Sequence, residues 1–477
     1  MHQLESSNIY SISDNELLMD NIPLTNLSET FGTPLYIFSE KKLLANYNEL
    51  YNAFNSLYPK TQIAYSTKNN VLGGIIEKIL QKTDWFEVTS LGETQSVMKA
   101  SSSVGVKPNI IQTNIYKPSD LILESIKNGH ILAIDSYQDC VNIERIAEKV
   151  GMEAKVFLRV NPGIRMSIEG TVFSSAATWA KCANIISTRE KLLDDLEESE
   201  VKSWLAPLHN IPSKDTAEYL SNYITEKNTL NLLGIHAHPG SQVTSLEYYK
   251  YFSLIVTRFF KNLNESLGNR LVYLDIGGGY PVDYKSGENI SGVNDIAKVI
   301  ISNIKEAKIS PKLILESGRY ITANAGSLLS KVVLTKENAV TQNIAVLDVS
   351  FYSDLIDTIA ARWHFESKLV NDLPIEKKSE KYELFGITND SLDLIDPQRR
   401  MCSCGKLITP ERKRIFPRIL NSGDLILILS SGAYSTCFNS NYCLHSKPPV
   451  ILIDTEKKVH LIRNKQSYEE IVSNEGN

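Results

Sequence analysis

The sequence predicts a TIM-like (β/α)8 barrel joined to a second, mostly antiparallel β domain. Two observations support this fold class. Eight short apolar segments recur along the first two thirds of the chain, and helix-like amphipathic segments separate them. After about residue 325 the apolar segments continue, but long helix-like segments become rare. Because apolar strands that alternate with helices form parallel sheets covered on their outer face, eight such units favour a closed barrel over an open sheet.

The eight predicted barrel strands are each followed by a connection in which a helix fits. The segment VLGGIIEKILQK after the first strand and SYQDCVNIERIAEKV after the fourth have the apolar spacing of amphipathic helices. A further apolar segment, LYIF at residues 35–38, precedes the series and is a candidate for a different sheet. The predicted barrel strands are residues 62–66, 85–90, 109–114, 130–136, 155–161, 231–238, 271–279 and 312–317.

One connection is much longer than the others. Early strands begin about 21 to 25 residues apart, whereas 76 residues separate Lys155 from Asn231. We therefore predict an insertion at about residues 166–206, which includes the acidic, helix-like segment 187–204. A solvated surface helix is the first interpretation of that segment, and a lid or partner-binding element is the alternative.

The last third of the chain predicts the β domain. Strand-like segments such as SLLSKVVLT, NIAVLDVS, DLILILS, PVILID and KVHLIR are separated by polar connections with few helical patterns. We assign residues 36–325 to the barrel, and residues 1–35 together with 326–477 to the β domain.

The composition excludes several classes of protein. The 477 residues carry 50 Lys+Arg and 55 Asp+Glu, a net charge of −5 that argues against a basic nucleic-acid-binding surface. No apolar run approaches the roughly 18 residues of a membrane span, and the N-terminal residues lack the features of a secretory signal. Six cysteines are too sparse for a disulfide framework. We therefore expect a cytoplasmic enzyme that acts on a small molecule, without a nucleic-acid or membrane partner.

Residues capable of catalysis follow several of the predicted strands. The active site of such a barrel lies at the carboxyl ends of the strands, where Lys68, His238 and Glu316 stand. The glycines Gly277, Gly278 and Gly279 allow close backbone approach and can present N–H groups to an anion, or they form a tight turn without a ligand. A lysine for a Schiff base, a phosphate-binding loop and a carboxylate that keeps a ring nitrogen protonated together predict pyridoxal 5'-phosphate as cofactor.

Six motifs in order make the chain resemble the fold-type III pyridoxal-phosphate-dependent decarboxylases of diaminopimelate, ornithine and related amino acids. The resemblance implies that Lys68 is the Schiff-base lysine, that His238 stacks on the cofactor ring and that Glu316 contacts the pyridinium nitrogen. It further implies that the phosphate is held by Ser241, Gly277, Gly278, Gly279, Gly318, Arg319 and Tyr434. The motifs are YSTKNN (65–70), VTSLGE (88–93), GIHAHPGSQ (234–242), LDIGGGYP (274–281), ESGR (316–319) and GAYSTCFNSNY (432–442).

The resemblance also implies a homodimer with shared active sites. Cys402 in MCSCGKLI (401–408) matches the cysteine that the partner subunit contributes to protonate the decarboxylated carbon, and Tyr442 would line the substrate site. Cys402 and Cys404 as metal ligands are the competing interpretation. Zinc would require two more ligands, and Cys437 and Cys443 are too far apart in sequence, so we predict no metal.

The motifs expected to bind substrate depart from the family pattern. Ser403 and Lys406 replace two acidic residues, Arg399 and Arg400 replace a Gly-Pro pair, and Asp357 stands near a position where the family has arginine. From Arg399, Arg400 and Lys406 we predict a substrate with extra negative charge, such as a carboxylated intermediate of siderophore-like specialised metabolism. The alternatives are diaminopimelate decarboxylation in lysine biosynthesis, a racemase, and a protein that binds the cofactor without decarboxylation.

Overall fold

The computed structural model describes residues 8–164, 181–208, 213–284, 290–337, 343–360, 364–374, 378–395, 400–401, 407–408 and 413–475. The chain divides into two compact units. The first, here called the barrel unit, comprises Tyr47–Pro281 and Asn289–Gly318. The second, the β unit, comprises Met1–Asn46, Val282–Glu288 and Arg319–Asn477. The predicted domain boundaries at residues 36 and 325 stay predictions.

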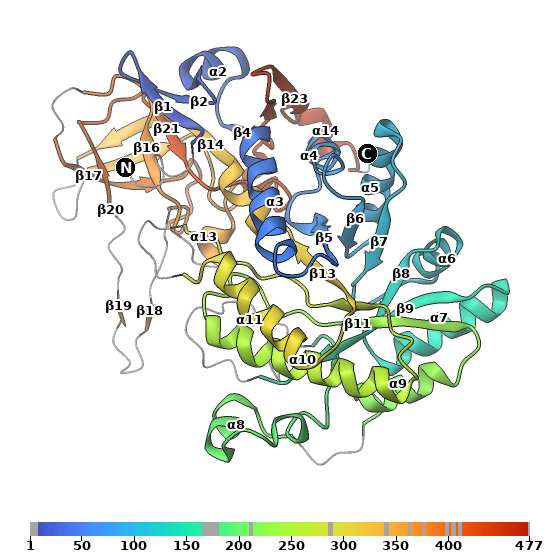
Figure 1. The fold of residues 1–477 in the computed structure, drawn as a ribbon. Coiled ribbons are helices and arrows are strands. Elements are labelled where there is room, and N and C mark those ends of the chain that lie inside the picture. Colours follow the sequence, from blue (N-terminus) through green and yellow to red (C-terminus); the bar gives the residue numbers. More distant parts are fainter. Residues whose placement is uncertain are drawn as a thin grey trace. The chain divides into compact units, whose positions relative to one another are not determined.

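The barrel unit is built around a closed ring of parallel strands (Figure 1). Among the described residues, eight strands follow one another in this ring, and β8 pairs with β9 to close it. Each of the eight coincides with a predicted strand, so the barrel is confirmed. The strands are β5 (Thr61–Ser66), β6 (Trp85–Val88), β7 (Asn109–Gln112), β8 (Ile131–Ile134), β9 (Ala154–Asn161), β11 (Leu230–His236), β12 (Tyr273–Asp275) and β13 (Lys312–Ser317).

Local sequence explains where several barrel helices begin and end. Ser90 and Ser136 accept hydrogen bonds from the backbone N–H groups of Glu93 and Asp139, which caps two helices at their N-termini. Gly105 ends the first of these helices in the left-handed conformation, with φ of 72°, that glycine adopts without strain. The helices are α3 (Glu40–Asn55), α4 (Gly73–Ile79), α5 (Leu91–Val104), α6 (Ser119–Asn128), α7 (Tyr137–Val150), α9 (Ala217–Thr225), α10 (Leu246–Ser266) and α11 (Val293–Glu306), with the 3-10 turn η1 (Thr67–Asn69).

The barrel interior is filled with side chains, as a closed barrel of this size requires. Small and large apolar residues from β5, β7, β8, β9 and β13 form one buried cluster. Polar and charged residues stand beyond this layer, toward the carboxyl ends of the strands. The cluster comprises Ala64, Ile111, Ile131, Ala133, Phe157 and Ile314.

The described part of the predicted insertion packs on the barrel unit. Its strand β10 (Asn184–Ile185) pairs in parallel with β9, and its helix α8 (Glu198–Trp204) follows the 3-10 turn η2 (Lys191–Leu193). The Trp204 ring stacks on Tyr251 of α10, with ring centroids 4.7 Å apart. Burial of this aromatic pair holds α8 against α10. Residues 166–180 lie outside the described residues, and no described helix is long and apolar enough to cross a membrane.

The β unit contains a mostly antiparallel sheet, as predicted. Its strand order is β20-β17-β15-β14-β4-β22-β23, with β21 joining β14 to β16. The LYIF segment forms β4 and pairs with β14 and β22, so it belongs to this sheet. The strands are β4 (Leu35–Ser39), β14 (Gly326–Lys336), β15 (Asn343–Leu347), β16 (Ser367–Leu369), β17 (Glu380–Phe385), β20 (Lys413–Phe416), β21 (Leu425–Ile428), β22 (Val450–Ile453) and β23 (Val459–Arg463).

The N-terminal segment covers one face of this sheet with apolar side chains. Leu17 and Met19 of this segment pack with Leu329 of β14 and Leu427 of β21 in one buried core. The smaller elements of the unit are β1 (Tyr10–Ser13), β2 (Glu16–Met19), β3 (Ile22–Pro23), α2 (Leu24–Phe31), α12 (Arg319–Thr322), η3 (Ala323–Ala325), α13 (Asp357–Ala360), β18 (Arg400–Met401), β19 (Leu407–Ile408), η4 (Tyr442–Leu444) and α14 (Tyr468–Val472).

Candidate active site

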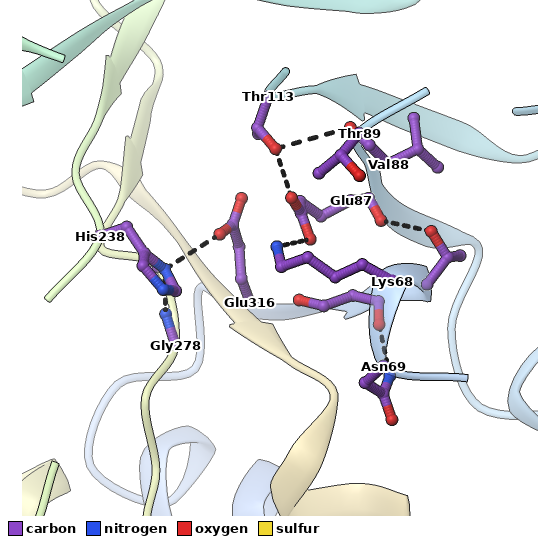
Figure 2. Close-up of polar contacts among 12 residues, drawn as sticks. Lys68, Asn69, Glu87, Val88, Thr89, Thr113, His238, Gly278 and Glu316 are labelled. Carbon is purple, nitrogen blue, oxygen red and sulfur yellow. Dashed lines mark hydrogen bonds and ion pairs between the residues drawn. The ribbon is translucent and has the colours of Figure 1, made fainter. Parts of the chain in front are cut away.

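Lys68 stands at the carboxyl end of β5, within the short turn η1. Its Nζ lies 2.5 Å from Oε2 of Glu87, a fully buried residue of β6 (Figure 2). The hydroxyl of Thr113, just after β7, donates a hydrogen bond to the other oxygen of the same carboxylate. Two neighbouring strands therefore hold the carboxylate that orients the lysine amine.

Glu316 brings a second buried carboxylate to the same end of the barrel. Its Oε1 lies 3.2 Å from Nε2 of His236, and its Oε2 lies 3.4 Å from Nδ1 of His238. Figure 2 shows the Glu316 carboxylate between His238 and the Lys68–Glu87 pair. The structure thus brings together Lys68, His238 and Glu316, which the sequence places far apart.

Both histidines lower the pKa of Glu316, and His236 has the larger effect. Burial alone would raise the pKa of the Glu316 carboxyl, but the charge of His236, with a further contribution from Lys68, holds that pKa well below its usual range. Burial lowers the pKa of His238. The Nδ1 atom of His238 accepts a hydrogen bond of 3.2 Å from the Gly278 N–H, which fits a neutral imidazole. Glu316 is therefore an ionised carboxylate beside a neutral ring at His238.

The glycine loop after β12 allows backbone to pack against the other site residues. A Cβ on Gly277 would lie 2.6 Å from Nδ1 of His238, and one on Gly278 would lie 2.0 Å from the carbonyl oxygen of Glu316. The N–H of Gly277 donates to Asp275 and that of Gly278 to His238, so these two groups are used within the protein. Close packing explains the requirement for glycine at 277 and 278, and a Cβ on Gly279 would lie 2.7 Å from the carbonyl oxygen of Gly240.

Two further predicted residues of the barrel unit lie near this loop or near the lysine. Ser241 is partly exposed and follows Gly240, whose carbonyl oxygen limits the space at Gly279. Gly318 packs against the side chain of Asn69, because a Cβ there would lie 2.5 Å from its Nδ2.

An ion-pair network continues from the lysine toward the insertion. Arg159 of β9 donates to the carbonyl oxygen of Thr113 at 2.8 Å and pairs with Asp135 at 3.0 Å. The same Asp135 oxygen accepts the backbone N–H of Ala183, at the start of the described insertion segment. The insertion is therefore tied to charged residues at the carboxyl ends of β8 and β9.

In the β unit, Arg319 is held by an acid and two tyrosines. Its Nη1 lies 2.7 Å from the Tyr284 hydroxyl and 3.3 Å from Oδ2 of Asp357, and its guanidinium lies 4.4 Å from the centre of the Tyr434 ring. Arg319 and Asp357 are both buried. Tyr442 stands in η4 and is 42% exposed, with its ring 5.3 Å from that of Tyr352.

The remaining predicted site residues fall outside what the structure describes. Cys402, Cys404, Arg399, Ser403 and Lys406 are not among the described residues. Arg400 is described by its backbone alone, in β18.

Four residues around Lys68 and Glu316 received no role from the sequence, namely Glu87, Thr113, His236 and Asp275. Glu87 could have been found, because an acid inside the apolar run WFEV is unusual unless it is paired. Thr113 offers no such signal, since a threonine at a strand end is common.

The arrangement fits pyridoxal 5'-phosphate. It offers a partly exposed amine on Lys68, an ionised buried carboxylate on Glu316 that can hold a protonated ring nitrogen, and a flat neutral imidazole on His238. His236, Asp275 and Glu316 also have ligand atoms close enough together to hold a metal ion. The sequence did not predict this grouping.

Comparisons with known proteins agree with this chemistry. The family described as "Pyridoxal-dependent decarboxylase, pyridoxal binding domain" matches residues 44–199 and 211–323. The diaminopimelate decarboxylase of Aquifex aeolicus is 25% identical and covers 99% of both chains, and that of Staphylococcus aureus is 26% identical over 96% of this chain and 97% of its own. The M. jannaschii diaminopimelate decarboxylase, in a crystal structure with L-lysine, superimposes with a TM-score of 0.81 at 23% identity, covering 99% and 98% of the two chains.

Proposed function

Because the chain belongs to the pyridoxal-dependent decarboxylases, it is a carboxy-lyase that uses pyridoxal 5'-phosphate, and we propose that it removes the α-carboxylate of diaminopimelate. The resemblance drawn from the six sequence motifs is thereby confirmed at the level of the family. The expectation of a siderophore-like substrate gains no support from the three relatives above, which are all named diaminopimelate decarboxylases. The alternative in lysine biosynthesis fits them better.

The names of the relatives support the substrate, and the observation that supports the chemistry is the ionised Glu316 in the same site as Lys68 (Figure 2). Bound pyridoxal phosphate supplies an electron sink for the electron pair that remains when CO2 leaves. That sink works best when the ring nitrogen is protonated, and a carboxylate held ionised in a buried site favours the proton on its partner nitrogen. Glu316 is such a carboxylate, with His236 3.2 Å away.

The other barrel residues bind and orient. Lys68 would hold the cofactor through its amine, and Glu87 orients that amine at 2.5 Å when the amine is free. His238 provides a ring face for stacking, because its neutral imidazole is fixed by the Gly278 N–H. Within the barrel unit, we assign the phosphate to Ser241, Gly279 and Gly318.

The proton that replaces CO2 has to come from a group near the α-carbon. We assign this step to Cys402, contributed by the partner subunit of a homodimer, and we assign Tyr442 to the substrate-binding surface. Both assignments rest on the sequence motifs, and a Cys402→Ala variant with slow turnover and an unchanged cofactor spectrum would support the first.

A second candidate substrate follows from the charges around the cysteine motif. Arg399, Arg400 and Lys406 favour a more anionic amino-acid conjugate, since the family has acidic residues at two neighbouring positions. Asp357 works against this candidate, because it stands near a position where the family has arginine and pairs with Arg319 instead of supplying a positive charge.

The test is CO2 release from a substrate panel with the purified, cofactor-loaded enzyme. The panel contains diaminopimelate, lysine, ornithine, arginine and carboxylated diamino-acid conjugates. We expect diaminopimelate to give the highest kcat/KM. A preference of tenfold or more for a conjugate would replace diaminopimelate by the second candidate, and exchange of the α-proton without CO2 would contradict decarboxylation of that compound.

A further inference from the structure

Three acid–base side chains meet inside the barrel unit on neighbouring strands. His236 ends β11, Asp275 ends β12 and Glu316 lies on β13, and all three residues are at most 2% exposed. One nitrogen or oxygen atom of each side chain lies within 4.8 Å of the other two. His236 and Asp275 are also direct partners in the register between β11 and β12. Two carboxyls therefore share one buried space with one imidazole.

The two carboxyls have different surroundings. Oε1 of Glu316 lies at ion-pair distance, 3.2 Å, from Nε2 of His236, although without hydrogen-bond geometry, and Oε2 lies 3.4 Å from Nδ1 of His238. Oδ1 of Asp275 accepts the N–H of Gly277 at 2.9 Å, whereas its buried Oδ2 has no hydrogen-bond partner among the described residues. No described cation lies within ion-pair distance of Asp275. The carboxyl of Asp275 thus combines full burial with a single neutral donor.

This asymmetry decides which carboxyl carries a proton. Two carboxylates this close in a buried site cannot both ionise without a large electrostatic penalty, and the better-paired one keeps the charge. Burial, reinforced by the charge of Glu316, raises the pKa of Asp275 well above its usual range. The opposite holds at Glu316, where His236 lowers the pKa.

We infer that Asp275 is a neutral carboxylic acid, protonated on Oδ2, and that Asp275 and His236 are positioning residues that leave Glu316 as the single carboxylate of the trio. Oδ1 is occupied by the Gly277 N–H, so Oδ2 is the oxygen free to carry the proton and to donate it toward Glu316 or His236. The inference rests on the proposed function in one respect, since it takes Glu316 to face the cofactor's ring nitrogen. The role of Asp275 is then to hold the glycine loop and the Glu316 carboxylate in position without adding a second negative charge.

The isosteric variant Asp275→Asn separates this inference from its alternatives. An asparagine keeps an oxygen for the Gly277 N–H and replaces the acid O–H by an N–H donor, so it reproduces a neutral acid but not a carboxylate. Asp275→Leu fills similar space and removes both hydrogen-bonding functions. Asp195→Asn is the matched control, because Asp195 is an exposed carboxylate of the same unit paired with Arg258 at 2.5 Å.

The first measurement needs neither cofactor nor activity. Infrared spectra of the full-length protein, with and without 13C-labelled aspartate, should contain the carbonyl band of a protonated carboxyl at about pH 9. At that pH Asp354 and Asp357 have lost their protons, because burial raises their pKa values only to about 7 and about 6. That band should disappear in Asp275→Asn and persist in Asp195→Asn. Absence of the band in the wild-type protein, or its persistence in Asp275→Asn, overturns the inference. Because this readout uses no substrate, it stands even when no member of the substrate panel is decarboxylated.

The second measurement is the dissociation constant of pyridoxal phosphate. We expect Asp275→Asn to stay within about threefold of the wild type, and Asp275→Leu to bind at least about tenfold more weakly, as for groups that orient a binding residue. Equal losses in the two variants would mean that Asp275 acts as a carboxylate and overturn the inference. Metal in the purified protein at one ion per chain, lost in Asp275→Asn, would also overturn it by making the trio a metal site.

Discussion

The buried carboxyl of Glu316 in the barrel unit behaves differently from two buried carboxyls of the β unit. Glu316 of the barrel unit is 2% exposed, and yet His236 holds its pKa well below the usual range against the effect of burial. In the β unit, burial raises the pKa of Asp354 to about 7 and that of Asp357 to about 6. Asp357 is raised although Arg319 stands 3.3 Å away. Similar burial therefore accompanies opposite pKa shifts, and the neighbours decide the direction.

The difference shows where the protein maintains buried charge. Toward the carboxyl ends of the barrel strands, cations and carboxylates alternate, as in Lys68–Glu87, Arg159–Asp135 and Lys117–Asp139. Asp354 in the β unit receives hydrogen bonds mainly from neutral donors, the Ser350 N–H and the Asn439 amide. Glu316, beside His236, keeps its charge near neutral pH, whereas Asp354, with neutral donors, takes up a proton near neutrality.

Removal of the lysine amine should have the largest effect. Lys68→Ala deletes the amine to which we assign covalent binding of the cofactor, so we expect kcat/KM for CO2 release to fall by on the order of 10³-fold or more. The visible absorbance of covalently bound cofactor should also be lost. The control is Lys60→Ala. Lys60 is an exposed lysine just before β5 that donates a hydrogen bond to Ser310, and this variant should keep both the activity and the absorbance. Covalent cofactor in Lys68→Ala would contradict the assignment.

The second expected effect concerns the β unit and pH. In the unfolded chain the Asp354 carboxyl loses its proton near pH 4, and in the folded protein it does so near pH 7. Between these values the folded state binds more protons, so the free energy of unfolding should fall as pH rises, by up to about 4 kcal/mol from this group. Chemical denaturation of wild type and Asp354→Asn between pH 4 and 8 measures this contribution. The wild type should lose free energy of unfolding relative to Asp354→Asn as pH rises. If the wild type gains it instead, Asp354 is an ionised, stabilising carboxylate and the prediction is wrong.

The third expected effect concerns the ion pair between Lys68 and Glu87 in the barrel unit. Glu87→Gln keeps the shape of the side chain and its contact with Thr113 but removes the charge that holds Lys68. Misplacement of the amine should lower kcat/KM about 10- to 100-fold while covalent cofactor is retained. Glu153→Gln, at an exposed glutamate that accepts a hydrogen bond from Asn231, is the control. Full activity in Glu87→Gln would mean that the ion pair does not position the lysine.

The sequence predicted the barrel because its strands are short, apolar and regularly spaced. It also predicted that Lys68, His238 and Glu316 converge, since the carboxyl ends of parallel strands meet at one end of a barrel. The pairing of Lys68 with Glu87 was missed, because it depends on which rotamer a buried acid adopts. Similarly, the contact of Asp357 with Arg319 joins segments 38 residues apart through a non-repetitive connection, and no periodic pattern encodes it.

The smallest expected effect tests whether an exposed ion pair contributes to the free energy of unfolding. Asp195 of the insertion and Arg258 of α10 form two hydrogen bonds of 2.5 and 2.8 Å, and Arg258 lowers the pKa of Asp195. The Asp195 side chain is 61% exposed, so solvent screens the pair, and Asp195→Asn should reduce the free energy of unfolding by less than about 1 kcal/mol. Urea denaturation at low and high salt measures this effect, and salt should weaken it further. A reduction in the free energy of unfolding as large as that expected at a buried ion pair would contradict this expectation. It would mean that the insertion needs the Asp195–Arg258 pair to stay packed on α10. The hydrogen bond from Arg258 to the Leu192 carbonyl oxygen would then not be enough to hold the insertion.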